Sequence, residues 1–488
     1  MDDDDSVQTR LSLVHCLSVL YYGYFTPYTT LFLTIGINMK IYSKMKQISL
    51  HALPVAMLWA GVSLDANALP AYSRQTGDDC AACHVGAYGP QLTPHGMKFK
   101  IGGYTDSDGK SGHIPLSAML VANYTHVAGD LPEAPKHYDD NNNFAVQEVS
   151  AFLAGKLMDH VGSFTQVTYS DIDRHGSSLD NMDIRATYDW DGTIFGFSLN
   201  NNPGVTDPLN TLPLWGFPYT SPDLGGGGPA ASVILDDGLG GTAWGTTLYA
   251  YTQDGLYGEV GFYRSFSRGQ LSSLNLEEGR EITNFGNYWH IAYIKDMHKQ
   301  SFSVGLLGLG IDLRDWDTRG ESDNYTDIGV DANYQFLGNR EHVCTLDFSH
   351  IKEKQNLKAT YAAGGSEHSN LTLKRTAITA AYFYKQTYGF SARYFNLSGS
   401  ADQGLYAAMD ENGNPISAGK PDSTGYTLQA DWTPFGKESS PYAPWANVRV
   451  GLQYTTYSKI NGESKNYDGS GRDAKDENTL SLFAWTAI

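Results

Sequence analysis

A two-residue alternation of apolar and other side chains runs through this chain from about residue 115 to residue 488. Examples are NVRVGLQYT at 447–455, RTAITAAYFY at 375–384 and LGLGIDL at 307–313. A period of two places successive side chains on opposite faces of a β-strand. The body of the chain is therefore predicted to be all-β, with apolar side chains outside and polar side chains inside.

Two kinds of connection separate the predicted strands. Long polar segments such as 130–143 and 410–425 alternate with tight turns such as 190–192 and 336–341. Long loops at one rim and short turns at the other are typical of outer-membrane barrels, which close so that no sheet edge meets lipid. At roughly 23 residues per strand and connection, the length predicts about 16 antiparallel strands. A soluble two-sheet sandwich is the alternative for such alternation.

Residues 39–68 have the layout of a secretory signal. Three lysines precede an apolar segment that closes on the small-x-small sequence ANA, so cleavage is expected after Ala68. Residues 1–38 begin MDDDD, the wrong charge for an export signal, and we interpret them as lying ahead of the true start. An inner-membrane anchor is the alternative for this first segment. The mature protein is expected in the outer membrane of a Gram-negative cell, in contact with lipid.

Charge and composition exclude several classes of protein. The net charge of -19 argues against a nucleic-acid partner, because phosphate binding needs a clustered basic surface. After residue 70, no uninterrupted apolar run approaches the roughly 20 residues that a membrane-spanning helix needs. Four cysteines are too few to form a disulfide framework in 488 residues.

The stretch DDCAACHVGAYGP, at 78–90, contains a Cys-x-x-Cys-His motif. In c-type cytochromes two such thiols form thioethers with haem and the adjacent imidazole binds the iron. A redox Cys-x-x-Cys would be expected within a βαβ unit, and a zinc site would need a second ligand pair. We therefore predict one covalent haem c, anchored by Cys80 and Cys83 with His84 as proximal iron ligand. Residues 69–114 would be the haem segment and 115–488 the barrel.

Other haem contacts are less constrained by the sequence. Met97 and His95, in LTPHGMKFK, are candidates for the sixth iron ligand, and His113 follows them. Methionine would raise the reduction potential relative to a second histidine. Each of the three is equally interpretable as a packing or surface residue. Arg74 is a candidate partner for a haem propionate, or a solvated arginine.

The segment YSRQTGDDCAACHVGAYGPQLTPHGMKFKIGGY, at 72–104, closely resembles the fused monohaem cytochrome-porins of the outer membrane. This family includes the iron-oxidising cytochromes of acidophilic and neutrophilic iron bacteria. Its pattern has Arg-Gln-Thr-Gly before the haem motif and Leu-Thr-x-Phe-Gly-Arg-x-Phe-Lys after it. This chain matches that pattern at Arg74, Gln75, Thr76, Gly77, Leu92, Thr93, Gly96, Phe99 and Lys100. It departs at His95, where the family has an aromatic residue, and at Met97, where it has arginine. The stretch at 198–219 also resembles the family.

The resemblance implies electron transfer of the iron:cytochrome c oxidoreductase type. Extracellular Fe(II) would be the donor, and a periplasmic cytochrome or other soluble carrier would be the acceptor. Two alternatives remain open: electron flow outward to an extracellular acceptor, and a passive porin with a haem-bearing plug. Acidic loop stretches such as 321–327 would attract cations or be solvated loop tips.

Overall fold

The computed structural model describes residues 70–488, except 171, 173–175, 213–214, 216–220, 237, 411 and 438. The predicted segment ahead of the true start, 1–38, and the predicted signal peptide, 39–68, lie outside the described residues.

One antiparallel sheet forms a closed barrel, because its first and last strands pair with each other. The strands are β1 (Leu116–Val127), β2 (Asn143–Met158), β3 (Val161–Ser170), β4 (Gly176–Trp190), β5 (Thr193–Asn200), β6 (Ala243–Tyr251), β7 (Leu256–Ser265), β8 (Glu281–Ile282), β9 (Gly286–Asp296), β10 (Gln300–Arg314), β11 (Asp323–Phe336), β12 (His342–Asn356), β13 (Asn370–Tyr384), β14 (Tyr388–Gly399), β15 (Ser423–Trp432), β16 (Asn447–Lys459) and β17 (Thr479–Ala487). The short β8 and the following β9 pair with the same edge of β10 and together form one strand of the wall. The predicted barrel of about 16 strands is confirmed.

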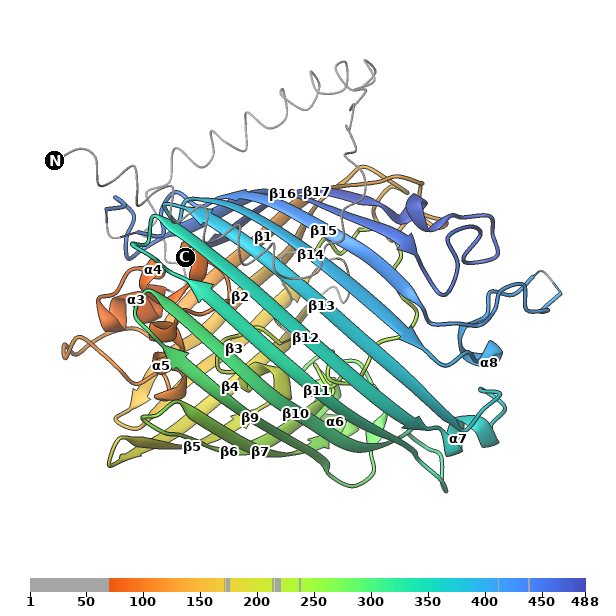
Figure 1. The fold of residues 1–488 in the computed structure, drawn as a ribbon, viewed down its shortest axis with the longest axis horizontal. Helices are drawn as coiled ribbons and strands as arrows, with labels where there is room; N and C mark the ends of the chain where they lie inside the picture. Colours follow the sequence, from red (N-terminus) through yellow and green to blue (C-terminus); the bar gives the residue numbers. More distant parts are fainter. Residues whose placement is uncertain are drawn as a thin grey trace, which may run out of the picture. The chain divides into compact units, whose positions relative to one another are not determined.

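Short helices lie ahead of β1 and in the connections between strands. They are α3 (Pro70–Thr76), α4 (Cys80–Cys83), η1 (Val85–Ala87), α5 (Pro94–Ile101), η2 (Pro203–Thr206), α6 (Arg268–Ser273), α7 (Lys358–Ala362), α8 (Gln403–Tyr406) and η4 (Ala474–Glu477). Figure 1 shows α3, α4 and α5 at the end of the barrel where the chain's C-terminus lies, and α7 and α8 at the opposite end. We call residues 70–114, which precede β1, the plug.

The two rims of the barrel differ in the length of their connections. At the rim that holds the C-terminus, turns such as 159–160 and 191–192 join the strands. At the other rim the connections include 128–142, 400–422 and 460–478. Outer-membrane barrels have short periplasmic turns and long extracellular loops. The rim beside the plug is therefore the periplasmic one.

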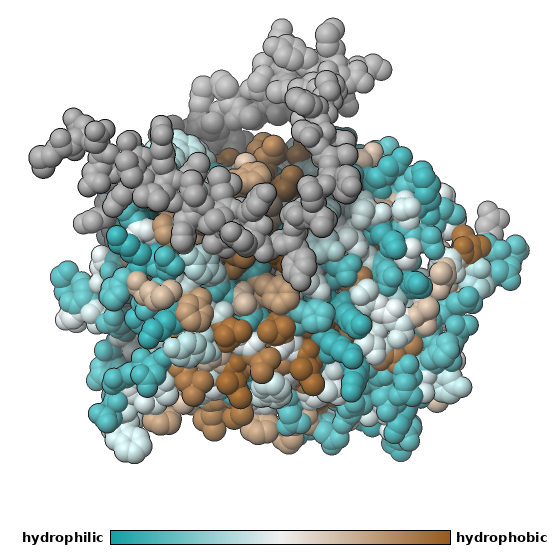
Figure 2. Space-filling view, viewed as in Figure 1, coloured by the Kyte–Doolittle hydropathy of each residue, from teal (hydrophilic) through white to brown (hydrophobic). Residues whose placement is uncertain are grey.

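The outer surface of the wall is apolar at mid-height. On β16, Arg449 and Gln453 are buried while Leu452 and Tyr454 are exposed, as the alternation predicts. Figure 2 shows apolar side chains gathered across the middle of one face, with hydrophilic residues toward both ends. A closed barrel with such a band belongs in a bilayer, so the chain is an outer-membrane protein.

No helix in the described part of the chain is long and apolar enough to span a membrane.

One strand departs from the apolar-outside pattern. On β10, Leu307, Leu309 and Ile311 are buried and lie on the lumen side of the wall. They belong to a cluster with apolar residues of the 201–242 connection, which folds into the lumen. The backbone N–H of Leu235 donates to Asp327 of the wall at 2.9 Å. These three side chains of β10 point into the lumen because they pack against the apolar residues of that connection. The alternation within the strand does not reveal this contact.

Candidate haem site

The Cys-x-x-Cys-His motif forms one short helical turn in the plug. Asp79 caps α4, its carboxylate accepting the backbone N–H of Ala82 at 2.8 Å. Residues three apart share one helix face, so Cys80 and Cys83 present their thiols on the same side. Both thiols are free, and both line a cavity of about 310 Å³ together with His84. The structure thus brings the three predicted haem residues together.

Aromatic rings from the plug and from the barrel form part of the cavity wall, beside acidic side chains such as Asp78 and Glu148. The aromatic residues are Tyr72, Tyr88, Phe99, Tyr104, Phe152, Phe164, Trp215 and Trp485. Tyr88 packs edge-on against Trp485 with ring centroids 4.7 Å apart. A concave, mostly apolar pocket of this size is typical of small-molecule and cofactor sites. Its lining fits a flat aromatic macrocycle.

The electrostatics of the motif suit haem attachment. Burial, and next the Arg449 guanidinium, lower the pKa of His84 to about 4. Burial raises the pKa of Cys80 to about 11 and that of Cys83 to about 12. The Nδ1 atom of His84 is buried without a hydrogen-bond partner. At neutral pH the site therefore holds a neutral imidazole, the form that could bind haem iron, and two protonated thiols, which could form thioethers with haem vinyl groups.

The barrel wall holds the segment that follows His84. Asn447, at the start of β16, donates from Nδ2 to the carbonyl of Ala87 at 2.7 Å. Arg449, two residues along the same strand, donates from Nη2 to the carbonyl of Tyr88 at 2.8 Å. Both wall side chains are buried. The proximal side of the candidate haem site is thus fixed by β16 as well as by the plug.

Helix α5 presents one face to the cavity and the opposite face to the barrel. Gly96, Phe99 and Lys100 line the cavity, following the i, i+3, i+4 spacing of one helix face. Met97 is fully buried with Ile101 in a different apolar cluster. Met97, a predicted sixth ligand, is therefore not among the residues that line the cavity.

The remaining predicted residues also lie outside the cavity lining. The Nε2 atom of His95 is 2.8 Å from a carboxylate oxygen of Asp78, and the His95 side chain is 49% exposed. Arg74 donates to the carbonyl of Leu116 at 2.7 Å and lies over the Trp445 ring. His113 pairs with Asp108 at the surface. Among these residues, His95 lies close to the motif, because its ligand atom and those of Asp78 and Cys83 all lie within 4.8 Å of one another.

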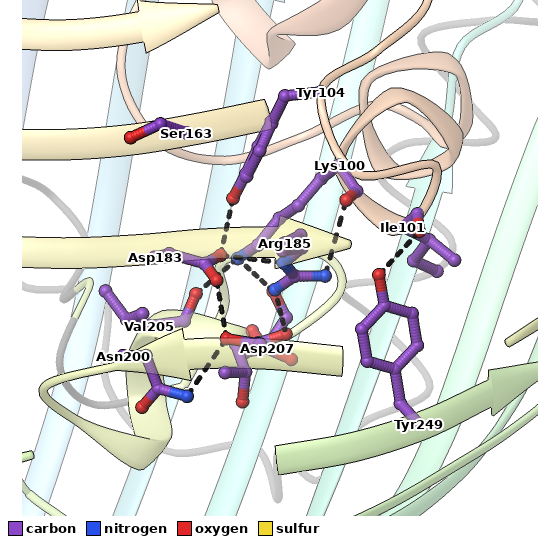
Figure 3. A network of polar contacts seen from close by, with 12 residues as sticks. Lys100, Ile101, Tyr104, Ser163, Asp183, Arg185, Asn200, Val205, Asp207 and Tyr249 are labelled. Atoms are coloured by element: carbon purple, nitrogen blue, oxygen red, sulfur yellow. Dashed lines mark hydrogen bonds and ion pairs between the residues drawn. The ribbon is translucent and has the colours of Figure 1, made fainter. Parts of the chain in front are cut away.

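A polar network ties the cavity side of the plug to the barrel (Figure 3). Lys100 donates from Nζ to the carbonyls of Val205 and Asp207, each at 2.6 Å. On β4, Arg185 pairs with Asp183 at 2.8 Å, and both side chains are fully buried. Tyr104 of the plug donates to Asp183 at 2.6 Å.

Sequence reasoning missed this network. Lys100 matched a pattern, but nothing in the sequence indicated its partners more than a hundred residues away. Asp183 and Arg185 carried only the weak signal of two charged residues on the lumen side of an alternating strand.

Fold and site together define a porin-like outer-membrane barrel with a helical plug in its periplasmic mouth. No protein-family model matches the chain. No curated protein matches its sequence.

Several solved outer-membrane structures are similar to this one at low sequence identity. In-vitro folded OmpT of Vibrio cholerae is 11% identical, with a TM-score of 0.42, over 78% of this chain and 99% of that one. An anion-selective porin from Comamonas acidovorans is 10% identical, with a TM-score of 0.43, over 76% and 98%. The channel DcaP of Acinetobacter baumannii is 12% identical, with a TM-score of 0.40, over 76% and 96%.

Proposed function

We propose that the chain is a c-type cytochrome fused to a porin-like barrel, carrying electrons from extracellular Fe(II) to a periplasmic cytochrome. One observation carries the proposal: Cys80, Cys83 and His84 line a single aromatic cavity inside the periplasmic mouth of a closed barrel. The predicted Fe(II) donor follows from the resemblance of residues 72–104 to the iron-oxidising cytochrome-porins. The haem, its donor and its acceptor are all parts of this proposal.

The chain's own residues bind and orient the cofactor. Cys80 and Cys83 would form the thioethers and His84 would bind iron on the proximal side. The aromatic side chains would cover part of the haem and limit the access of water to it. When bound, haem c would supply a one-electron centre, so that each Fe(II) oxidised to Fe(III) reduces one cytochrome in the periplasm. No side chain needs to act as acid or base in that exchange.

Because of the position of the cavity, the electron donor and the electron acceptor would reach the haem from opposite ends of the barrel. Its wall includes Met119 near the periplasmic end of β1 and Ala487 at the end of β17. A periplasmic cytochrome therefore approaches from the near side. An apolar band about 25 Å tall separates the two rims, and electron tunnelling decays steeply with distance. The donor must therefore enter the lumen from the extracellular rim to come close to the haem.

The buried network favours a plug that stays fixed in the barrel rather than one that moves as a gate. Opening a pore at the plug would separate Lys100 from the carbonyls of the 201–242 connection and Tyr104 from Asp183. Leaving a buried hydrogen-bonding group without its partner costs about 1–3 kcal/mol, and more when the group is charged. A passive porin whose plug moves to let solutes through is therefore disfavoured. Outward electron flow uses the same site, and the experiment below separates the two directions.

The test uses the purified full chain in proteoliposomes, with an oxidised soluble cytochrome c trapped inside and Fe(II) added outside. Rapid mixing should reduce the chain's haem first and the trapped cytochrome second. The Cys80→Ser, Cys83→Ser double variant should give neither signal, and His84→Ala should slow both. If wild-type haem stays oxidised under excess Fe(II) but is reduced by a reduced cytochrome, electrons run outward and the proposal is wrong.

A further inference from the structure

The barrel wall contributes a thioether to the candidate haem cavity. Met119, on β1, lines the cavity together with His84. Its side chain is only 9% exposed and belongs to an apolar cluster with Tyr88, Val121 and Phe152. This methionine lies outside the haem segment, on a membrane-spanning strand that pairs with β2 and β17.

Two of the three tyrosines in the cavity wall direct their hydroxyl groups to other partners, whereas the buried hydroxyl of Tyr88 has no hydrogen-bond partner within the residues that the structure describes. Histidine, methionine, cysteine and tyrosine are the side chains that ligate haem iron. The hydroxyl of Tyr72 donates to the carbonyl of Ser163 at 2.8 Å, and that of Tyr104 donates to Asp183 at 2.6 Å. Tyr88 would have to ionise to bind iron, and burial raises its pKa well above the usual value.

The two remaining alternatives are also poorly placed. Lys100 directs its ammonium group to two backbone carbonyls and to Oδ1 of Asn210, at 2.5–2.6 Å. Met97, the methionine nearest to His84 in sequence, faces a different cluster on the far side of α5. Among the described residues that line the cavity, Met119 is the single methionine.

We infer that Met119 is the sixth haem ligand, so that the plug supplies the proximal histidine and the barrel wall supplies the distal thioether. The inference rests on the proposed haem. It follows that haem coordination is complete only when the plug is seated in the barrel. A neutral, soft thioether also raises the reduction potential relative to a second imidazole. A raised potential suits a centre that takes electrons from Fe(II).

The test compares Met119→Leu with the matched control Met97→Leu, because leucine replaces methionine in a core with little change in volume. In the ferric full-length protein, Met119→Leu should lose the weak near-red absorption band of methionine-ligated haem. Its midpoint potential should also fall. Met97→Leu should keep both, and covalent haem content should be equal in the two variants. A third variant, Met119→His, should restore a six-coordinate low-spin spectrum at a lower potential than wild type.

Failure of this inference is distinguishable from failure of the proposed function. If Met119→Leu keeps the band and the potential, or if Met97→Leu loses them instead, Met119 is not the ligand although the haem is present. If the wild-type chain carries no covalent haem, both the ligand assignment and the proposed function are wrong.

Discussion

At the scale of single residues, the candidate site is defined by local spacing. Two thiols three residues apart share one face of a helical turn, and the imidazole follows at the next residue, wherever that turn lies in the fold. For this reason the sequence alone predicted Cys80, Cys83 and His84 as a group, and the structure places all three at one cavity.

Replacing both thiols should abolish haem attachment and spare the barrel. We expect the Cys80→Ser, Cys83→Ser variant to fold, because serine is smaller and both positions lie in the plug and outside the strands. Its intact mass should lack the mass of haem, and haem staining of a denaturing gel should be negative. Retention of covalent haem in this variant would contradict the assignment.

Gly96 allows α5 to approach the haem motif. A Cβ atom added there would overlap the carbonyl oxygen of Cys83. We expect Gly96→Ala to destabilise the plug by about 1–3 kcal/mol, the usual range for overpacking. Haem loading should fall with it, measured as the ratio of Soret to protein absorbance. Gly269→Ala is the matched control, because a Cβ atom at Gly269 meets nothing within 4 Å.

At the scale of elements, packing partners decided what the sequence could not predict. The sequences of β10 and β16 alternate in a similar way. The apolar side chains of β16 face lipid, whereas the buried Leu307, Leu309 and Ile311 of β10 pack against the 201–242 connection. The side of α5 that meets the cavity likewise depends on how the helix sits in the barrel. Met97, a sixth-ligand candidate chosen by its closeness in sequence, lies on the face of α5 that packs against the barrel, whereas His95 lies beside Asp78.

The contact between α5 and the 201–242 connection should make stability depend on pH. Burial, and next the Arg185 guanidinium, lower the pKa of Lys100 from 10.5 to about 7. Between those values the unfolded chain holds one proton more than the folded chain, so stability rises with pH by up to about 1.4 kcal/mol per unit. Below pH 7 both states are protonated and this contribution is flat.

Thermal unfolding of the detergent-solubilised protein, followed by circular dichroism between pH 7 and 10, measures this dependence. In the Lys100→Met variant, the part of the increase in stability with pH that Lys100 contributes should be absent. Lys98→Met, at an exposed position on the same helix, is the control and should keep it. An identical pH profile for wild type and Lys100→Met would show that the lysine titrates normally when folded.

At the scale of the whole molecule, rim asymmetry and strand alternation were sufficient to predict a closed barrel. Both are repeated over about 370 residues, so a local exception such as β10 did not change the outcome. The sequence did not predict how deeply the plug lies in the barrel. This depth depends on buried contacts such as Arg449 with the carbonyl of Tyr88, which join residues more than 350 positions apart in the chain.

The position of the candidate haem cavity should limit the size of an external electron donor. Because the cavity lies at the periplasmic rim, an external donor must enter the lumen to come within tunnelling distance. In proteoliposomes with the long loops facing outward, free Fe(II) should therefore reduce the haem much faster than Fe(II) bound to a large chelating polymer. Solubilising the liposomes in detergent opens the periplasmic mouth to both donors and should narrow the difference. Equal rates for the two donors before solubilisation would show that electrons reach the haem without entry into the lumen.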